Sequence, residues 1–590
     1  DGVVQSLLIS PRPSPSSATA TATDTDTATA TDTATATATD ANAATAAAAA
    51  GAGEATADAE AHAGEAHTSL AYTGEAHTGL SLSGADQAML DGAHGRAAQV
   101  AMRIVARVAS LQHAAELVDI SQAHIDGCIY VGPASLRFAQ KMLALGGAVR
   151  VPTTLNAISV DQRRWREIGV PISLGEPASA LGDAYVALGC TPSFTCAPYL
   201  LPSAPRPGEH VAWGESNAVV YANSCLGART QKYADFLDLC MAITGRAPHA
   251  GAHLAPARAP ALEVRVAAEV AARADELLYP TLGYACGLHA DARVPLVMGL
   301  ERLSPTQDDL KAFSAAFGTS ASAPLFHMRA HTPEAEAAAA HLAARGGGHE
   351  VVELDAAALA KAHAALDSGA SDEVQLVALG NPHFSLAECA RLGELCRNAT
   401  ARGEAKHGGV AFVVTTGRQT LAAAREAGYP PGDGPPGDGL PYPSPDPYPY
   451  HHPTPNPDPR YVAALEAFGV TLLTDTCWCM LGEPVVPPAA VTLVTNSAKF
   501  AHYAPGLVGR QVRFASLEGC VAAALTGRVP RAPPRWCAEG VQKPPRLRDG
   551  GATPRAPLAT RAPLTVAPAR RVLHTHVAPA AVRALRRVLR

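Results

Sequence analysis

The stretch VQLVALGNPHFSLAE, residues 374–388, decides the fold class. Its apolar, β-branched first half predicts a buried strand, and the polar GNPHF segment predicts a loop that leads into a helical pattern. The same order recurs along the chain, with further predicted strands at 117–120, 148–151, 184–188, 294–298, 410–414, 470–473 and 491–495. Strands that alternate with loops and helices are typical of an α/β protein.

Polar residues follow most of these predicted strands directly. The loops are SQAHIDGC (121–128), PTTLN (152–156), GCTPSFTCAPY (189–199), GNPHFSLAE (380–388), TDTCWC (474–479) and NSAKFAHYAPG (496–506). Ligands of open α/β sheets bind just outside the carboxyl ends of the strands. We therefore expect several of these loops to converge on one pocket.

Four of the cysteines in those loops are candidate metal thiolates: Cys128, Cys190, Cys196 and Cys477. No C-x-x-C pair occurs, and Cys477 and Cys479 would point in opposite directions on an extended chain, so the spacing argues against a structural zinc module. A site that takes one thiolate from each of several loops fits iron or an iron–sulfur cluster better. Buried structural thiols remain the alternative.

Composition divides the chain of 590 residues into three parts. We expect residues 1–85, which are rich in Ala and Thr, to be disordered, because they offer no large side chains to bury. Residues 86–527 carry the strand and loop pattern, interrupted at 430–459 by thirteen prolines that exclude a helix or a central strand. Residues 528–590 form a tail rich in Pro and Arg, which we interpret as a solvated extension, with nucleic-acid attraction as the alternative.

The charge is unevenly distributed. The tail from residue 528 holds thirteen Arg and one Lys against two acidic residues, a net charge of +12, so the rest of the chain carries −18 of the total of −6. Twelve scattered cysteines do not resemble a disulfide framework and favour a reducing, cytoplasmic compartment. No apolar run of 18 residues occurs, which excludes a membrane-spanning helix of the usual kind.

The first ordered element is predicted near residue 86. Val100, Ile104, Val108 and Leu111 recur at helical spacing while arginines take the other side. This pattern predicts an amphipathic helix that packs on a core through those four residues.

Seven long motifs resemble the catalytic domain of the aconitase X family, and the resemblance extends over roughly residues 86–527. They are SQAHIDGCIYVG (121–132), VPTTLNAISVD (151–161), ALGCTPSFTCAPYLLP (187–202), GEHVAWGESNAVVYANSCLGARTQKYADFLDLCMAITGRAP (208–248), GNPHFSLAE (380–388), DTCWCM (475–480) and TNSAKFAHYAPGLVGRQVRFASLEGCVAAALTG (495–527). The family includes the large subunit of phosphomevalonate dehydratase and the bacterial cis-3-hydroxy-L-proline dehydratases. The resemblance implies an aconitase-like α/β core of several subdomains and a hydro-lyase that removes water from 5-phosphomevalonate or cis-3-hydroxy-L-proline.

The resemblance also implies an iron–sulfur cluster or a mononuclear iron. Cys196 and Cys477 match positions that look like its ligands. Archaeal members read Gly-Cys-Pro-His where this chain has Asn381 before Pro382, so Cys128 is expected to substitute as the third ligand, with Cys190 as a weaker alternative. An iron acting as Lewis acid would activate the hydroxyl leaving group while a base removes the neighbouring proton.

The remaining candidate residues are assigned by role. The catalytic candidates are His124, Asp126, His383 and Lys499. The substrate-binding candidates are Thr153, Thr154, Asn156, Ser216, Asn217, Asn223, Arg229, Asn496, Ser497 and His502. Carboxylates and phosphates need cationic and hydroxyl donors of this kind, although Ser, Thr and Asn at the start of a helix also serve as caps.

Aconitase-type enzymes complete their site with a small swivelling domain, whose Ser is expected to serve as the base. Neither end of this sequence has the strand and loop pattern of such a domain. We therefore expect the chain either to need a separate small swivelling subunit or to be a truncated product that has lost such a domain. Two competing hypotheses are a catalytically inactive scaffold or iron-dependent regulator that keeps the fold, and a zinc-binding structural protein.

Overall fold

The computed structural model describes residues 79–426, 460–530 and 533–537. Of the segment 1–85 that is expected to be disordered, residues 1–78 lie outside the described residues, as do the Pro-rich insertion at 430–459 and most of the basic tail. Residues 79–85 are described, and the expected disorder does not extend to them, because Ser81 pairs with Glu116 and a helix begins at Gly84. Within the described ranges, none of the helices has the length and apolar character needed to cross a membrane. All twelve cysteines fall in these ranges and are free thiols.

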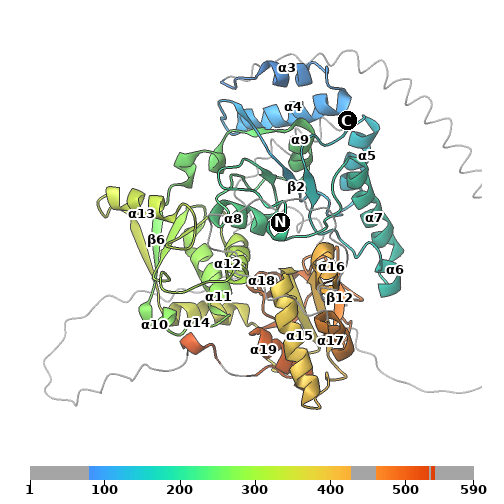
Figure 1. Ribbon diagram of the computed structural model, residues 1–590, viewed down its shortest axis with the longest axis vertical. Coiled ribbons are helices and arrows are strands. Elements are labelled where there is room, and N and C mark those ends of the chain that lie inside the picture. Colours follow the sequence, from blue (N-terminus) through green and yellow to red (C-terminus); the bar gives the residue numbers. More distant parts are fainter. Residues whose placement is uncertain (1–78, 427–459, 531–532, 538–590) are drawn as a thin grey trace, which may run out of the picture. The chain divides into compact units, whose positions relative to one another are not determined.

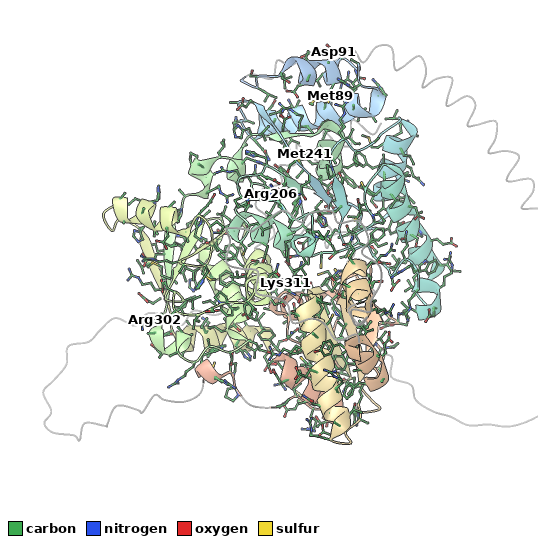
Figure 2. The ribbon with its side chains drawn as sticks, viewed as in Figure 1. Met89, Asp91, Arg206, Met241, Arg302 and Lys311 are labelled. Atoms are coloured by element: carbon green, nitrogen blue, oxygen red, sulfur yellow. The ribbon has the colours of Figure 1, made fainter. Side chains whose placement is uncertain are left out.

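The first part of the chain, up to residue 258, is built around a small parallel sheet in the order β3-β2-β4 and an antiparallel pair, β1 and β5. Its strands are β1 (Leu117–Asp119), β2 (Ala123–Ile125), β3 (Thr153–Leu155), β4 (Ala212–Trp213) and β5 (Arg246–Pro248). Its helices are α3 (Gly84–Leu90), α4 (Arg96–Leu111), α5 (Pro133–Ala144), α6 (Trp165–Ile168), α7 (Ile172–Ala187), α8 (Ser216–Ser224) and α9 (Leu237–Thr244), with short 3-10 turns η1 (Pro198–Leu200), η2 (Gly251–His253) and η3 (Ala255–Arg258). Met89 of α3 and Met241 of α9 belong to one apolar core with α4 (Figures 1 and 2).

The second part forms a parallel sheet of four strands in the order β8-β7-β6-β9. The strands are β6 (Leu262–Val266), β7 (Pro295–Met298), β8 (His327–Met328) and β9 (Glu350–Leu354). The helices are α10 (Ala268–Ala271), α11 (Leu278–Ala290), α12 (Gln307–Ser320), α13 (Ala335–Ala344) and α14 (Ala356–Leu366). Helix α12 packs against α11, against α8 of the first part and against α18 (Ala498–Leu507) of the third part, as Figure 1 shows near its centre.

The third part is a parallel sheet of five strands in the order β12-β11-β10-β13-β14. The strands are β10 (Leu376–Phe384), β11 (Ala411–Thr416), β12 (Thr471–Leu473), β13 (Thr492–Thr495) and β14 (Gln511–Phe514). The helices are α15 (Leu386–Ala401), α16 (Arg418–Glu426), α17 (Arg460–Phe468), α18 (Ala498–Leu507) and α19 (Leu517–Thr526), followed by the 3-10 turn η4 (Arg535–Cys537). The order of the strands reverses between β10 and β13, which makes this edge a topological switch point.

Lys311 joins the second part to the third. Its side chain is buried on α12, and its ammonium nitrogen lies 2.8 Å from Asp308 Oδ1 and 3.4 Å from the carbonyl oxygen of His383. It also forms an ion pair with Glu388 of α15; Figure 2 labels Lys311. Because a buried ammonium needs such partners, this contact fixes α12 against the end of β10.

The predicted α/β class is confirmed, and strands are present at six of the eight predicted runs. Two strand predictions are wrong. Residues 148–151 form no strand, and the strand β3 lies in the following segment that was predicted as a loop. Residues 184–188 belong to the end of helix α7, because a short apolar run fits a buried helix as well as a buried strand.

The predicted amphipathic helix is present as α4, but its buried face differs from the prediction. Val100, Ile104 and Val108 are half-buried and Leu111 is 45% exposed. The fully buried residues are mainly alanines, together with Met102 and Val105. Small side chains let α4 approach α9 closely, so the larger residues lie at the margin of the contact.

Candidate active site

The end of β10 leaves its sheet at the switch point. Its pairing with β11 shifts between Leu379 and Phe384, so the residues between them are free to turn outward. Gly380 begins this departure with a φ of +96°, and a Cβ there would lie 2.1 Å from the carbonyl oxygen of Thr415, so only glycine fits. Asn381 and the next residues thereby reach the edge where β13 also ends.

Three thiols gather at this edge. Cys196 precedes η1, Cys477 follows β12, and both pack together with Ala157, with Cys479 and Met480 alongside. The backbone N–H of His383 donates to Cys196 Sγ at 3.2 Å, and Asn381 Nδ2 donates to Cys479 Sγ at 3.3 Å. A hydrogen bond with Cys196, together with burial, raises the pKa of Cys477 to about 12.

A turn brings Cys477 and Cys479 to the same side. The expectation that they point in opposite directions assumed an extended chain, whereas residues 478–480 form a turn in which the N–H of Met480 donates to the carbonyl oxygen of Cys477 at 2.9 Å. Trp478 between them is fully buried, and its Nε1 donates to the carbonyl oxygen of Leu379 at 2.7 Å. This tryptophan anchors the turn in the core, so both thiols face the site.

A buried ion pair lies beside the thiols. Lys499 Nζ, on the first turn of α18, is 2.6 Å from Glu215 Oε1, and both side chains are buried. Burial opposes the charge of Lys499, but Glu215 and the three thiols hold its pKa well above the usual value. Asn217 donates to Glu215 and, at 3.0 Å, to the carbonyl oxygen of Cys196. The pair thus ties α8 of the first part to α18 of the third beside Cys196.

His383 is held at both ring nitrogens. Nε2 lies 2.7 Å from the carbonyl oxygen of Thr476 and Nδ1 lies 3.2 Å from Thr195 Oγ1. Since a carbonyl only accepts, Nε2 carries the proton. Burial lowers the pKa of His383 to about 4, so the ring stays neutral and holds the two thiol-bearing loops together.

Carboxyl groups and a second lysine surround the ion pair on the side of the first part. Asn156 Nδ2 donates to Asp126 Oδ1 at 2.5 Å, and Asp238 Oδ2 accepts the N–H of Asp126 at 2.6 Å. Burial, together with repulsion from Asp235 and Glu215, raises the pKa of Asp126. Burial also raises the pKa of Asp238, to about 6.

Lys232 completes this group. Burial lowers its pKa to about 8, against the attraction of Glu215, and its Nζ donates to the carbonyl oxygen of Ala321 at 2.9 Å. Lys232 and Lys499 thus both interact with Glu215, and Glu215 lies in one charged region with Asp126, Asp235 and Asp238. A zwitterionic ligand matches such a set better than a multiply anionic one.

Cys128 lies apart from the three thiols. It belongs to the apolar core of the first part, where its Sγ donates to the carbonyl oxygens of Ile125 at 3.4 Å and Asn156 at 3.3 Å. Burial, with repulsion from Asp126 and Asp238, raises its pKa well above the usual value. Cys190 lies in the same core. The structure thus groups Cys196 and Cys477 with Cys479 and leaves Cys128 and Cys190 outside the group.

The catalytic candidate His124 and several substrate-binding candidates have structural partners. His124 Nδ1 lies 2.8 Å from Thr154 Oγ1 within the β2–β3 pair, and burial lowers the pKa of His124 to about 3. Thr153 Oγ1 donates to the carbonyl oxygen of Val151 at 2.8 Å. Ser497 caps α18, with its Oγ accepting the N–H of Phe500 at 3.1 Å and donating to the carbonyl oxygen of Asn381.

Three further candidates are directed away from the thiols. Asn223 spans the loop to Thr230, accepting its N–H and donating to its carbonyl oxygen, each at 3.0 Å. Arg229 Nη1 donates to the carbonyl oxygen of His253 at 2.9 Å, and His502 Nδ1 lies 3.1 Å from the hydroxyl of Tyr284. Ser216 begins α8 next to Glu215, and Asn496 is half-buried after β13.

The sequence reasoning missed Cys479, Lys232, Asp235 and Asp238 as members of this region. Cys479 was visible in the TDTCWC loop, and the buried Trp478 between the cysteines is the signal that favours a turn. Lys232, Asp235 and Asp238 lie within the matched motif at 208–248, in a segment whose contacts the spacing alone does not reveal.

Among the described residues, no set of three or more His, Cys, Asp or Glu side chains is arranged as a metal site. The donor chemistry of the three thiols nevertheless fits a cluster of iron and sulfide, for which thiolates are the usual ligands. Lys499 supports this fit, because a buried ammonium balances the negative charge that thiolate ligands bring. Asn381 Oδ1 is buried without a hydrogen-bond partner among the described residues, so a further polar atom lies beside Cys479.

Family models match nearly all of the described chain. The aconitase X first domain matches residues 79–256, the aconitase X second domain matches 260–364, and the aconitase X third domain matches 374–430 and 453–526. Their boundaries follow the three parts of the structure.

Three relatives illustrate the similarity. The chain is 53% identical over 456 residues to a cis-3-hydroxy-L-proline dehydratase of Pseudomonas aeruginosa, covering 77% of this chain and 71% of the relative. It is 50% identical to a protein of the same name from Hypocrea jecorina, covering 75% and 68%. It is 32% identical to the phosphomevalonate dehydratase large subunit of Methanothermobacter thermautotrophicus, covering 72% and 94%.

A solved structure has the same architecture. The holo-form of aconitase X from Thermococcus kodakaraensis matches with a TM-score of 0.62 and 26% sequence identity, covering 75% of this chain and all of that one.

Proposed function

The chain belongs to the aconitase X family, and from that premise we propose that it is a dehydratase that removes water from cis-3-hydroxy-L-proline. The observation that carries the proposal is the group of three thiols beside the buried Lys499–Glu215 ion pair. It combines ligands for an iron centre with a cation at the edge where α/β sheets bind their ligands.

The charges around the site support this substrate over 5-phosphomevalonate. A hydroxyproline carries one carboxylate and one ring ammonium, so its carboxylate can pair with Lys232 and its ammonium with the Asp238 carboxylate. A phosphorylated acid would bring two or more extra negative charges into a region where carboxyl groups already outnumber ammonium groups. The greater identity to the hydroxyproline dehydratases points to the same substrate.

We propose that Cys196, Cys477 and Cys479 hold an iron–sulfur cluster or a single iron. When bound, iron would supply Lewis acidity to the hydroxyl group that leaves. The earlier assignment of Cys128 as a ligand is not carried into this proposal, because Cys128 already donates to two backbone carbonyls in a separate core.

The chain's own residues bind and orient the substrate. The raised pKa of Lys499 keeps Nζ protonated, so it can donate a hydrogen bond to the leaving hydroxyl oxygen. Glu215 fixes that ammonium in place, and neutral His383 holds the loops of Cys196 and Cys477 together. Removal of the proton from the neighbouring carbon is assigned to a small swivelling subunit or domain, because relatives of this chain are named large subunits.

The test begins with anaerobic reconstitution of the full chain with iron and sulfide, followed by incubation with each substrate, with and without an aconitase X small subunit. We expect cis-3-hydroxy-L-proline to give a ring acid lighter by one water in mass spectrometry, and 5-phosphomevalonate to remain unchanged. Faster dehydration of 5-phosphomevalonate would contradict the substrate. Stoichiometric iron without turnover of either compound under all conditions would favour the inactive scaffold.

A further inference from the structure

Arg418, the first residue of α16, touches both loops that carry the paired cysteines. Its guanidinium forms a bidentate ion pair with Asp475, including an Nη2 to Oδ2 distance of 2.9 Å. Its Cζ also lies 4.7 Å from the centre of the Phe194 ring. Asp475 is two residues before Cys477 and Phe194 is two residues before Cys196, so one side chain contacts the same relative position in each loop.

The loop that carries Cys477 bends at Asp475. Its side chain is fully buried and its φ is +69°, a left-handed value that is strained for a residue other than glycine. Its carboxylate also accepts the N–H of Gln162 at 3.2 Å, and its carbonyl oxygen accepts the N–H of Ile158 at 2.6 Å. These contacts compensate for the strain and fix where the loop turns toward Cys477.

Phe194 has the matching role in the Cys196 loop. It is fully buried with a φ of +40°, so this loop also turns through a left-handed residue. Stacking of a guanidinium on an aromatic face holds the ring while leaving the planar N–H groups available for the carboxylate. The next residue, Thr195, contacts His383, which itself donates to Cys196.

We propose that Arg418 is a positioning residue that sets the spacing of the Cys196 and Cys477 thiols by clamping both bends at once. The two loops come from different parts of the chain and have little regular secondary structure near the cysteines. A lysine could supply the charge but neither the bidentate pair nor the stacked plane. The proposal depends on the proposed function only in treating these two thiols as ligands of one centre.

The test compares the Arg418→Gln, Arg418→Lys and Arg425→Gln variants of the full chain in the metal-free state. Arg425 is the matched control, because it lies on the same helix and pairs with Glu466 at the surface. Diamide oxidises two adjacent thiols to a disulfide and is itself reduced to the hydrazine, and peptide mass spectrometry measures the rate at which the Cys196–Cys477 disulfide forms. Metal content and activity after reconstitution are measured in parallel.

We expect Arg418→Gln to lower the rate of disulfide formation about tenfold and Arg418→Lys to lower it less. Arg425→Gln should form the disulfide at the wild-type rate. Asp475→Asn should slow it as Arg418→Gln does, and the double variant should be no slower than either single variant. A wild-type rate in Arg418→Gln, or equal slowing in Arg425→Gln, would overturn the proposal.

Two further readouts separate the possible failures. If Arg418→Gln does not fold, as shown by its melting curve, the comparison of Arg418→Lys with wild type decides, and an unchanged rate in that variant overturns the proposal. The disulfide rate does not depend on turnover. If Arg418→Gln slows formation of the Cys196–Cys477 disulfide but the chain dehydrates neither substrate, the positioning role is supported and the proposed function is contradicted.

Discussion

Cys128 and the pair of Cys196 and Cys477 are equally inaccessible, with 0%, 2% and 6% of their surfaces exposed, yet their surroundings differ in charge. Cys128 lies among carboxyl groups that oppose a thiolate. Cys196 and Cys477 lie beside the Lys499 ammonium, and Cys196 also accepts the backbone N–H of His383. Burial therefore does not separate Cys128 from the proposed ligand thiols, whereas the sign of the neighbouring charge does.

The largest expected effect comes from the thiols themselves. Cys477→Ser should lower the iron content after anaerobic reconstitution by more than about tenfold, because serine is a poor ligand for iron in a thiolate site. Iron and acid-labile sulfide analysis measures the change. Cys128→Ser is the control and should keep the wild-type iron content, and an equal loss in both variants would remove the distinction between the two groups.

The charge beside the thiols should matter next. Lys499→Met leaves the buried Glu215 carboxylate unpaired, which we expect to lower the free energy of unfolding by about 3–5 kcal/mol. Denaturant unfolding measures it, and adding Glu215→Gln should recover part of the loss. Arg293→Met breaks an exposed pair with Glu350 and should cost far less stability than Lys499→Met, because solvent screens exposed charges. Similar losses for both pairs would contradict the special position of Lys499.

The carboxyl groups around Cys128 predict a pH dependence. Because burial raises the pKa of Asp238 from 3.8 to about 6, its folded state favours the protonated form. The raised pKa of Asp238 therefore adds roughly 3 kcal/mol to the free energy of unfolding below pH 4. This stabilisation is lost as the pH rises from 4 through 6. Asp238→Asn should flatten this part of the unfolding profile between pH 4 and 7. Asp91→Asn, at an exposed position, should leave the slope unchanged.

The smallest effect is expected from Cys128→Ala. A thiol in an apolar core acts as a small hydrophobic side chain, so its removal should cost about 1 kcal/mol of unfolding free energy. Reconstituted activity should remain at the wild-type level. A loss of activity with unchanged stability would show that Cys128 takes part in the reaction after all.

The third sheet could be predicted from the sequence because its strands are apolar runs bounded by polar loops, as at 470–473 and 491–495. Residues 184–188 could not, because periodicity over five residues does not separate a strand from the end of a buried helix. The loops after β12 and β13, which the sequence singled out, bring Cys477 and Lys499 close together in the structure. Cys479 lies beside Cys477 because of a turn that Trp478 anchors, and local spacing does not reveal this turn. The ion pair between Lys499 and Glu215 joins residues 284 positions apart, so local spacing does not reveal it either.

The Lys311 contact has a consequence for how the molecule comes apart. Its ammonium is buried on α12 but draws on Glu388 of α15 and on the backbone beside the thiols. Separating the second part from the third would leave this charge with only Asp308 as an ionic partner, at a high cost. Heating should therefore melt the two parts in one cooperative calorimetric transition, and loss of the thiol site should coincide with it instead of preceding it.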